Sequence, residues 1–162
     1  MEAKKPQRQC QPCTACCDGW LRIVIKGVDV HPGRPCPHST GSGCDDYENR
    51  PVHPCRHFAC GWIIDNSPLP EWMKPDQAKV IVLLDKIKWQ GAPVDVAIPV
   101  GREIPAASLD WLKKFSEASK RPLLYSAQPE SAELGRTQLL YGWGPQAFYE
   151  QVVKWRQSGL QF

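Results

Sequence analysis

The chain has 162 residues, a net charge of +3, 42% hydrophobic residues and 23% charged residues. Such a chain is long enough to bury a core of its own, and its positive residues are spread out instead of forming the basic stripe typical of nucleic-acid-binding proteins. No apolar run follows the charged first residues, and none elsewhere is long enough to cross a bilayer. The sequence therefore predicts a cytoplasmic protein with no signal peptide and no membrane span, for which nucleic acid is an unexpected partner.

The first 62 residues differ in composition from the rest. All eight cysteines and all four histidines precede Gly61, together with only seven Leu, Ile and Val residues. So few apolar side chains cannot offset the backbone entropy lost on folding, which is about 1 to 2 kcal/mol per residue. We therefore expect residues 1–62 to be an irregular, cysteine-rich, metal-binding region.

The sequence from residue 63 to residue 162 is typical of a small unit of strands and helices. Apolar segments at residues 79–89 and 93–100, separated by Gln90-Gly91-Ala92, predict a β-hairpin. Ser108 precedes a predicted helix over residues 109–120, which ends before Pro122. One side of this helix is expected to carry the following residues: Leu112, Phe115 and Ser119.

Two further strands and a second helix complete the predicted elements. Residues 123–126 and 139–143 are the expected strands. Pro145 is expected as the first residue of a helix that continues to residue 158, with Phe148, Val152 and Trp155 in one apolar stripe. The predicted fold class is thus α+β, with the cysteine-rich half packed on the strand and helix unit in one compact domain.

The cysteines favour metal over disulfides. An even number of cysteines permits four disulfides, but a reducing cytosol disfavours them, and there the same pattern more often means metal binding or catalysis. The segment "CQPCTACC" at residues 10–17 contains two adjacent cysteines, Cys16 and Cys17. Adjacent residues of an extended segment project to opposite sides, so they would rarely serve one ion together. Either the pair serves two different sites, or one of the two binds and the other is spare.

Zinc and iron–sulfur clusters both fit this set of thiols. Each takes four thiolate ligands, so the eight cysteines would fill two sites. Cys10, Cys13 and Cys16 match the first three positions of the C-x2-C-x2-C-x3-C-P run of bacterial iron–sulfur proteins, but Trp20 stands at the fourth. A remote fourth ligand is offered by Cys36, which precedes a proline. The expected cofactor is zinc or an iron–sulfur cluster, [4Fe–4S] if iron.

The later cysteines have a looser spacing that also suits zinc. The expected metal ligands are all eight cysteines: Cys10, Cys13, Cys16, Cys17, Cys36, Cys44, Cys55 and Cys60. His57 lies between the last two, and its roles as nitrogen ligand and as ordinary surface histidine both remain open. His31, His38 and His53 are not expected to be ligands. Eight thiolates around two divalent ions leave about four negative charges, which Arg50 and Arg56 are placed in the sequence to offset.

Several of these motifs together resemble a known family. "CQPCTACC", "CPH" at residues 36–38 and "GCDDYENRPVHPCRHFACGW" at residues 43–62 are similar in kind and order to the bacterial CxxCxxCC zinc- or iron-chelating domain, the YkgJ-like cysteine-cluster proteins. The likeness covers roughly residues 10–62. It implies a zinc or iron–sulfur centre on the cysteines. It also implies a loop scaffold of the following residues: Tyr47, Glu48, Arg50, Pro51, Arg56 and Phe58.

The resemblance implies a metal site and no particular reaction. A more distant likeness is to flagellin lysine N-methylase, which has a cysteine-rich segment of this kind, but residues 63–162 show nothing typical of a methylase. The chain has no phosphate loop, dinucleotide motif, nucleophile elbow or H-E-x-x-H motif. The Cys13 and Cys16 pair lacks the β-α-β context of thioredoxin-like sites. Carboxylates near the cysteines are more typical of turns than of catalysis.

Three hypotheses about function remain. The favoured one is a metal-binding protein whose cysteine cluster organises the N-terminal half. The second is an iron–sulfur enzyme that acts on a small molecule or a protein side chain. The third is a nucleic-acid-binding zinc module, which the composition disfavours. Whether the protein is an enzyme, and whether it has a protein partner, stays open at this level.

Overall fold

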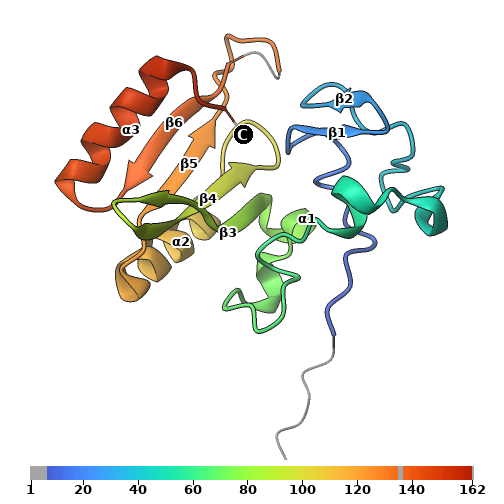
Figure 1. Cartoon of the computed structure of the whole chain (residues 1–162), viewed down its shortest axis with the longest axis horizontal. Helices are drawn as coiled ribbons and strands as arrows, with labels where there is room; N and C mark the ends of the chain where they lie inside the picture. Colours follow the sequence, from blue (N-terminus) through green and yellow to red (C-terminus); the bar gives the residue numbers. More distant parts are fainter. Residues whose placement is uncertain (1–6, 135–136, 162) are drawn as a thin grey trace, which may run out of the picture.

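The computed structural model of the chain describes residues 7–134 and 137–161. A four-stranded sheet with helices packed on it forms the C-terminal part, and the cysteine-rich segment lies on the side of strand β3 (Figure 1). The strands are β1 (Ile23–Ile25), β2 (Val28–Val30), β3 (Val80–Trp89), β4 (Ala92–Pro99), β5 (Leu123–Ala127) and β6 (Leu139–Trp143). The helices are α1 (Pro75–Ala78), α2 (Ala106–Ser119) and α3 (Gln146–Ser158). None of the helices in these two ranges is both long and apolar enough to cross a membrane.

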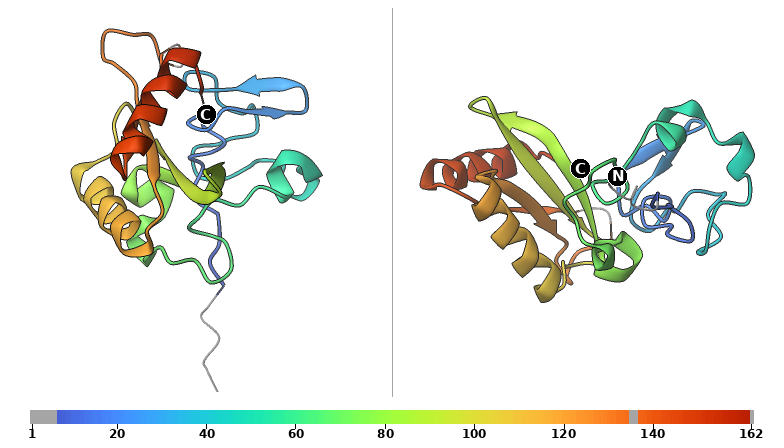
Figure 2. Two further views of the ribbon diagram at one scale, coloured as in Figure 1. Left: turned by 60° about the vertical axis from the view of Figure 1, so that its left-hand side comes forward. Right: turned by 90° about the horizontal axis from the view of Figure 1, so that it is seen from below.

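The sheet is mixed, with strand order β3-β4-β5-β6. The β3–β4 and β5–β6 pairs are antiparallel, whereas β4 and β5 are parallel because α2 carries the chain back between them. Leu124 pairs with Gly142 and Leu123 with Trp143, so these two pairs point to opposite faces. Helix α3 covers the Gly142 face, and α2 reaches Trp143 on the other through Glu117 (Figure 2).

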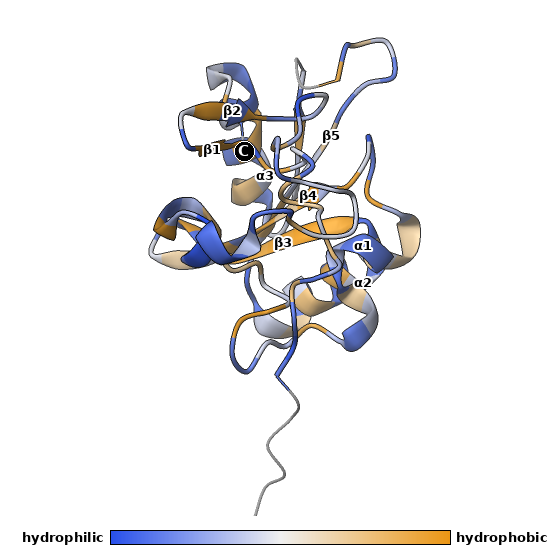
Figure 3. Cartoon of the chain, turned by 90° about the vertical axis from the view of Figure 1, so that its right-hand side faces the viewer, coloured by the Kyte–Doolittle hydropathy of each residue, from blue (hydrophilic) through white to orange (hydrophobic). Residues whose placement is uncertain are grey.

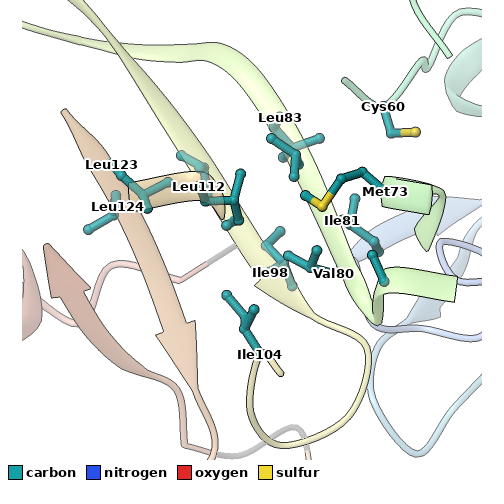
Figure 4. Packing of buried hydrophobic residues seen from close by; sticks show 14 of the residues in the cluster. Cys60, Met73, Val80, Ile81, Leu83, Ile98, Ile104, Leu112, Leu123 and Leu124 are labelled. Carbon is teal, nitrogen blue, oxygen red and sulfur yellow. The ribbon is translucent and has the colours of Figure 1, made fainter. Parts of the chain in front are cut away.

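The main hydrophobic core lies between the sheet and its helices. β3 is among the most hydrophobic segments of the chain (Figure 3), and its Val80 and Ile81 are fully buried. They belong to one hydrophobic cluster with Leu123 of β5, which lies beside Leu112, and with Met73, which lies in a 3₁₀ turn before α1 (Figure 4). The same cluster includes Cys60, so the core of the sheet continues into the cysteine-rich segment.

The structure confirms the predicted α+β class. The predicted hairpin is present, with β3 and β4 each within one residue of the expected bounds. Strands β5 and β6 also lie where the sequence predicts them. Helix α3 covers the expected residues, but Pro145 precedes the helix instead of being its first residue. Of its predicted stripe, Phe148 and Val152 are buried and Trp155 is half-buried.

Helix α2 differs from the prediction in its start and in its buried side. It begins at Ala106, so Ser108 lies inside the helix and does not precede it. The Ser108 hydroxyl donates a hydrogen bond of 2.7 Å to the backbone oxygen of Ala78, which allows this polar side chain to be buried. The buried stripe continues through Leu112 to Ser116. Of the residues expected on one side, Leu112 is buried, Phe115 is half-buried and Ser119 is exposed.

The cysteine-rich half contains one hairpin that the sequence analysis does not predict. β1 and β2 pair through a two-residue turn of Lys26 and Gly27, with φ values of 49° and 78°. Two consecutive positive φ values are typical of the turns that match the twist of a tight hairpin. The Lys-Gly pair between "IVI" and "VDV" is the signal that could have indicated it.

Gly142 allows α3 to pack directly on the sheet, and this close approach leads to a testable prediction. A Cβ atom at this position would lie 2.7 Å from Cγ2 of Val152 and 3.1 Å from Cε1 of Phe148. Gly142→Ala should therefore push α3 outward and lower the free energy of unfolding by about 1 to 3 kcal/mol, as measured by urea denaturation. In a Val152→Ala background the same change should cost less. An equal cost in both backgrounds would show that contact with Val152 is not the reason for glycine here.

Candidate metal centre

The segment that carries the first four cysteines is a tight loop held by its own backbone. The amide of Cys13 donates to the backbone oxygen of Cys10 at 2.9 Å, and the amide of Asp18 donates to that of Thr14 at 2.7 Å. The loop then passes close to the end of β2. At Gly19, where φ is +96°, a Cβ atom would collide with the His31 carbonyl, so only glycine permits this approach.

The eight thiols divide into two sets of four, and none of them is in a disulfide. Burial is the largest cause of each raised thiol pKa, and the thiols that lie near one another raise it further. These relations and the packing of the thiols on two hydrophobic clusters group them into two sets, while Cys10 of one set also acts on Cys17 of the other. The inner set is Cys10, Cys13, Cys16 and Cys60. The outer set is Cys17, Cys36, Cys44 and Cys55.

The adjacent residues Cys16 and Cys17 thus belong to different sets. Cys16 packs against the main core, which includes Cys60, whereas Cys17 packs against a second small cluster formed by Ile25, Val30 and Cys36. The two side chains therefore face different surroundings. This favours the alternative in which the pair serves two sites over the one in which one thiol is spare.

The inner set surrounds a small cavity. All four of its thiols line a space of about 40 Å³, which Cys17 of the outer set also borders, together with Ala15, Trp62, Ile63, Lys74 and Pro75. A space of roughly 10 to 15 Å³ on this measure holds one water-sized atom, so the cavity can accept an ion. The sulfur of Cys13 accepts hydrogen bonds from the backbone amides of Ala15 and Asp76. Donors of this kind stabilise a thiolate.

The outer set is assembled around the β1–β2 hairpin. Cys36 is buried against Ile25 and Val30, and its amide donates to the backbone oxygen of Cys17 at 2.7 Å. Cys44 pairs with Ser39 in an isolated β-bridge. Cys55 lies in a π-type turn, Val52–Arg56, which contacts β1. Each ligand candidate therefore comes from a different segment.

Asp18 connects the two segments that carry Cys17 and Cys36. One carboxylate oxygen accepts a hydrogen bond from the Thr14 hydroxyl and the other from the Ser39 hydroxyl, both at 2.7 Å. A carboxylate shared by two hydroxyl donors holds the loops at a defined separation. The sequence indicates a turn residue at this position, and the hydrogen bonds of Asp18 to Thr14 and Ser39 are an additional role.

Arg8 and Lys74 attach the inner set to the C-terminal part of the chain. The Arg8 guanidinium donates to the backbone oxygens of Trp62 and Leu69, each at 2.6 Å, and lies 4.6 Å from the Trp62 ring centre. Lys74 is buried, and its Nζ donates to the backbone oxygen of Gln11 at 3.4 Å. In the sequence Arg8 lies close to Cys10, whereas Lys74 lies close to no cysteine. No motif therefore indicates Lys74.

Burial favours the protonated form of five of the thiols, since it raises the pKa of Cys10, Cys13, Cys16, Cys17 and Cys55. Burial raises the pKa of Cys16 well above its ordinary value of 9.0, and the nearby Cys60, Cys10 and Cys13 thiols add to the effect. Burial raises the pKa of Cys17 to about 12, with smaller contributions from Cys10 of the inner set and from the other three thiols of the outer set. Because only thiolates bind metal strongly, an incoming ion has to displace these protons.

The two arginines that the sequence analysis singles out have different surroundings. Arg50 opposes the effect of burial by lowering the pKa of Cys10 and Cys55. Arg56 instead donates to the backbone oxygens of Arg50 and Glu48, at 3.0 and 2.8 Å, and so holds the loop. Of the two, Arg50 is the one whose charge reaches the thiols.

The histidines make contacts of other kinds. His57 is exposed and packs edge-to-face on His53, with ring centroids 4.3 Å apart. His38 pairs through Nδ1 with Asp45 at 2.8 Å, and His31 Nδ1 lies 2.9 Å from the backbone oxygen of Pro32. Nothing in these contacts brings an imidazole into either set of thiols.

Thiols are suitable metal ligands, but the sulfurs of neither set are arranged around a common metal position. Within residues 7–134 and 137–161, no three Cys, His, Asp or Glu side chains are arranged as ready ligands of one ion. The sulfurs of a set would have to rotate towards one another on binding. Three buried side-chain polar atoms lack a hydrogen-bond partner among these residues: Arg50 Nε and Asp76 Oδ1 in this half of the chain and its border, and Arg121 Nε beside the sheet. Asp76 lies close to Cys13, so a cation there would satisfy its carboxylate.

The fold and the site together define an α+β protein that carries eight free thiols in two sets beside its sheet. Comparisons with protein-family models, with curated proteins and with solved structures found no match for this chain. A function for the protein is therefore drawn from the thiols and their surroundings.

The raised thiol pKa values predict an alkaline loss of stability in the metal-free protein. Between its ordinary pKa of 9.0 and its folded value of about 12, Cys17 keeps its proton in the folded state and loses it in the unfolded state. The unfolded state then binds fewer protons, so the free energy of unfolding falls as pH rises through this window. Urea denaturation under reducing conditions should show a fall that begins near pH 9 and continues towards about pH 12, and that is smaller in Cys17→Ser. Equal falls in the two proteins would contradict the assignment.

Proposed function

We propose that the protein is a metal-binding protein in which the inner and outer sets each hold one zinc ion or one iron–sulfur cluster. The observation that supports this best is the placement of the adjacent Cys16 and Cys17 in two different sets of four thiols. Four thiolates are the full ligand complement both of a structural zinc ion and of a [4Fe–4S] cluster. Two sets of four therefore use every cysteine of the chain.

The surroundings of the thiols support the same proposal. The apolar walls formed by Trp62, Ile63 and Pro75 limit water access to the inner set. Backbone amides at the Cys13 sulfur and the positive side chains of Lys74 and Arg50 favour thiolates, which bind metal. Bound metal would cross-link segments that have few apolar contacts of their own, and iron would add the capacity for electron transfer.

The motif order described above adds independent support. The likeness to the CxxCxxCC zinc- or iron-chelating domain rests on residues 10–62, the region that contains both sets. Metal ions are thus the proposed ligands of this region. The proposal includes a cytoplasmic location, because a reducing cytosol keeps cysteines as thiols available to metal.

Metal content after substitution of single cysteines tests the proposal. Wild-type protein purified without oxygen should contain about two zinc ions, or iron and sulfide for about two clusters, per chain. Cys16→Ser should lose the inner centre and Cys17→Ser the outer one, so each variant should retain about half of the metal. Val24→Ser changes an exposed residue of β1 and should keep both centres. A folded, monodisperse wild-type protein free of both zinc and iron would refute the proposal.

Visible and electron paramagnetic resonance spectra of the same preparations distinguish zinc from iron–sulfur. A broad absorption band at about 400 nm that bleaches on reduction indicates an iron–sulfur cluster. A colourless preparation that contains zinc indicates a bound zinc ion. If zinc is bound, adding it to the metal-free protein near neutral pH should release about four protons per ion, because the buried thiols are protonated beforehand. Release of about two or fewer would indicate ligands other than these thiols.

A further inference from the structure

A larger pocket lies in the C-terminal part of the molecule, and its described lining residues all fall between Trp89 and Tyr149 in the sequence. Its volume is about 530 Å³, within the range of small-molecule sites. Three parts of the fold surround it, towards the left in Figure 1: the tip of the β3–β4 hairpin, the end of α2 with the link to β5, and the end of β6 with the start of α3. The pocket is therefore separate from the cysteine cavity.

Aromatic rings form a large share of the pocket wall. Trp89 from the hairpin, Trp143 from β6 and Tyr149 from α3 line it, and all three are half-buried. The Trp89 ring packs edge-to-face on Phe148, with ring centroids 5.3 Å apart. Nε1 of Trp143 donates a hydrogen bond of 3.2 Å to the Glu117 carboxylate. Rings that are held in place and still partly exposed offer flat apolar faces to a planar ligand.

The charged side chains of the pocket favour an anion. Lys120 and Arg121 line it together with one carboxylate, Glu117, among the described lining residues. The buried Asp95 pairs with the Arg121 guanidinium and fixes it, yet 26% of the Arg121 side chain stays exposed and its buried Nε has no hydrogen-bond partner within the described chain. Lys120 is exposed and forms no ion pair with a described carboxylate. Its ammonium group is therefore available to a ligand.

The start of α3 adds to this positive character. Gly144 and Pro145, the two residues before the helix, line the pocket. No side chain caps this end of α3, so the positive end of the helix dipole lies at the pocket. A helix end alone does not make a site, but beside Lys120 and Arg121 it reinforces their preference for an anion.

We propose that this pocket binds a small molecule that combines a planar aromatic ring with an acidic group. The ring lies against Trp89, Trp143 and Tyr149, and the acidic group lies near Lys120 and Arg121. Carboxylates and phosphates both offer negative acceptor oxygens, so aromatic carboxylic acids and nucleotides are the two sources of this chemistry. A cationic ligand is disfavoured because the two basic side chains would repel it. The inference does not depend on metal binding by the cysteines.

Two pairs of probes test the inference on the intact protein. Naphthoate and AMP each combine a ring with an acidic group, whereas naphthamide and adenosine have the same rings without the charge. An NMR titration follows the indole N–H signals, assigned with Trp→Phe variants. Trp89 and Trp143 report on the pocket, and Trp62, at the cysteine cavity, is the internal reference. Lys120→Gln is compared with Lys114→Gln, because Lys114 is an exposed residue of α2 outside the pocket lining.

The expected result is binding that depends on the acidic group. Naphthoate or AMP should bind with a dissociation constant of about 1 mM or tighter and should shift the signals of Trp89 and Trp143 more than that of Trp62. The neutral partner of that acid should bind about fivefold more weakly, the effect of one exposed ion pair. Lys120→Gln should weaken the acid by a similar factor and reduce the difference between acid and neutral partner. Lys114→Gln should leave both affinities unchanged.

The two pairs also identify the kind of acid, since tighter binding of naphthoate indicates a carboxylate and tighter binding of AMP a phosphate. Saturable binding by neither acid would overturn the inference, as would shifts confined to Trp62. Equal affinities for acid and neutral partner in the wild-type protein would do the same, and this comparison needs no variant. An equal loss in Lys120→Gln and Lys114→Gln would show a general effect of charge and no site.

Discussion

The peptide bond between Cys16 and Cys17 constrains the arrangement of the whole cysteine-rich half. It forces two neighbouring thiols into different surroundings, one on the core of the sheet and the other on the small cluster under the β1–β2 hairpin. Each thiol then needs three companions from elsewhere in the chain. The inner set is completed from the same loop and by Cys60, next to β3, whereas the outer set is completed from three separate segments. The thiols of the inner set are therefore closer together in the sequence than those of the outer set.

The two sets of thiols also interact electrostatically, since Cys10 raises the pKa of Cys17. Burial raises the pKa of Cys16 and Cys17, and metal bound as proposed would convert these thiols to negatively charged thiolates. Among the positive groups near them, Lys74 lines the inner cavity and the Arg50 charge lowers the pKa of Cys10 and Cys55. The surrounding fold therefore contains its counter-charges before any ion is bound, which reduces the reorganisation needed on binding.

Local patterns account for most of the C-terminal part. The β3–β4 hairpin and α3 follow from alternation and periodicity, which depend on neighbours within a few residues. Helix α2 starts earlier than predicted because Ser108 finds its partner at Ala78, thirty residues away in the chain. The β1–β2 hairpin depends on a local signal as well, the Lys26-Gly27 turn between two very short apolar segments.

The sequence by itself determined the fold class, the cysteine-rich and strand–helix halves, and the eight thiols as the candidate ligands, because these depend on composition and on short-range spacing. Only the tertiary structure decided how the thiols are shared between two sets and which positive groups accompany them. Cys60 joins the inner loop through the packing of Gly61 against β3, where the Gly61 amide donates to Val82 at 2.6 Å. Lys74, which follows the 3₁₀ turn Glu71–Met73, lines the cavity of the inner set. Contacts between residues so distant in the chain leave no trace in local spacing.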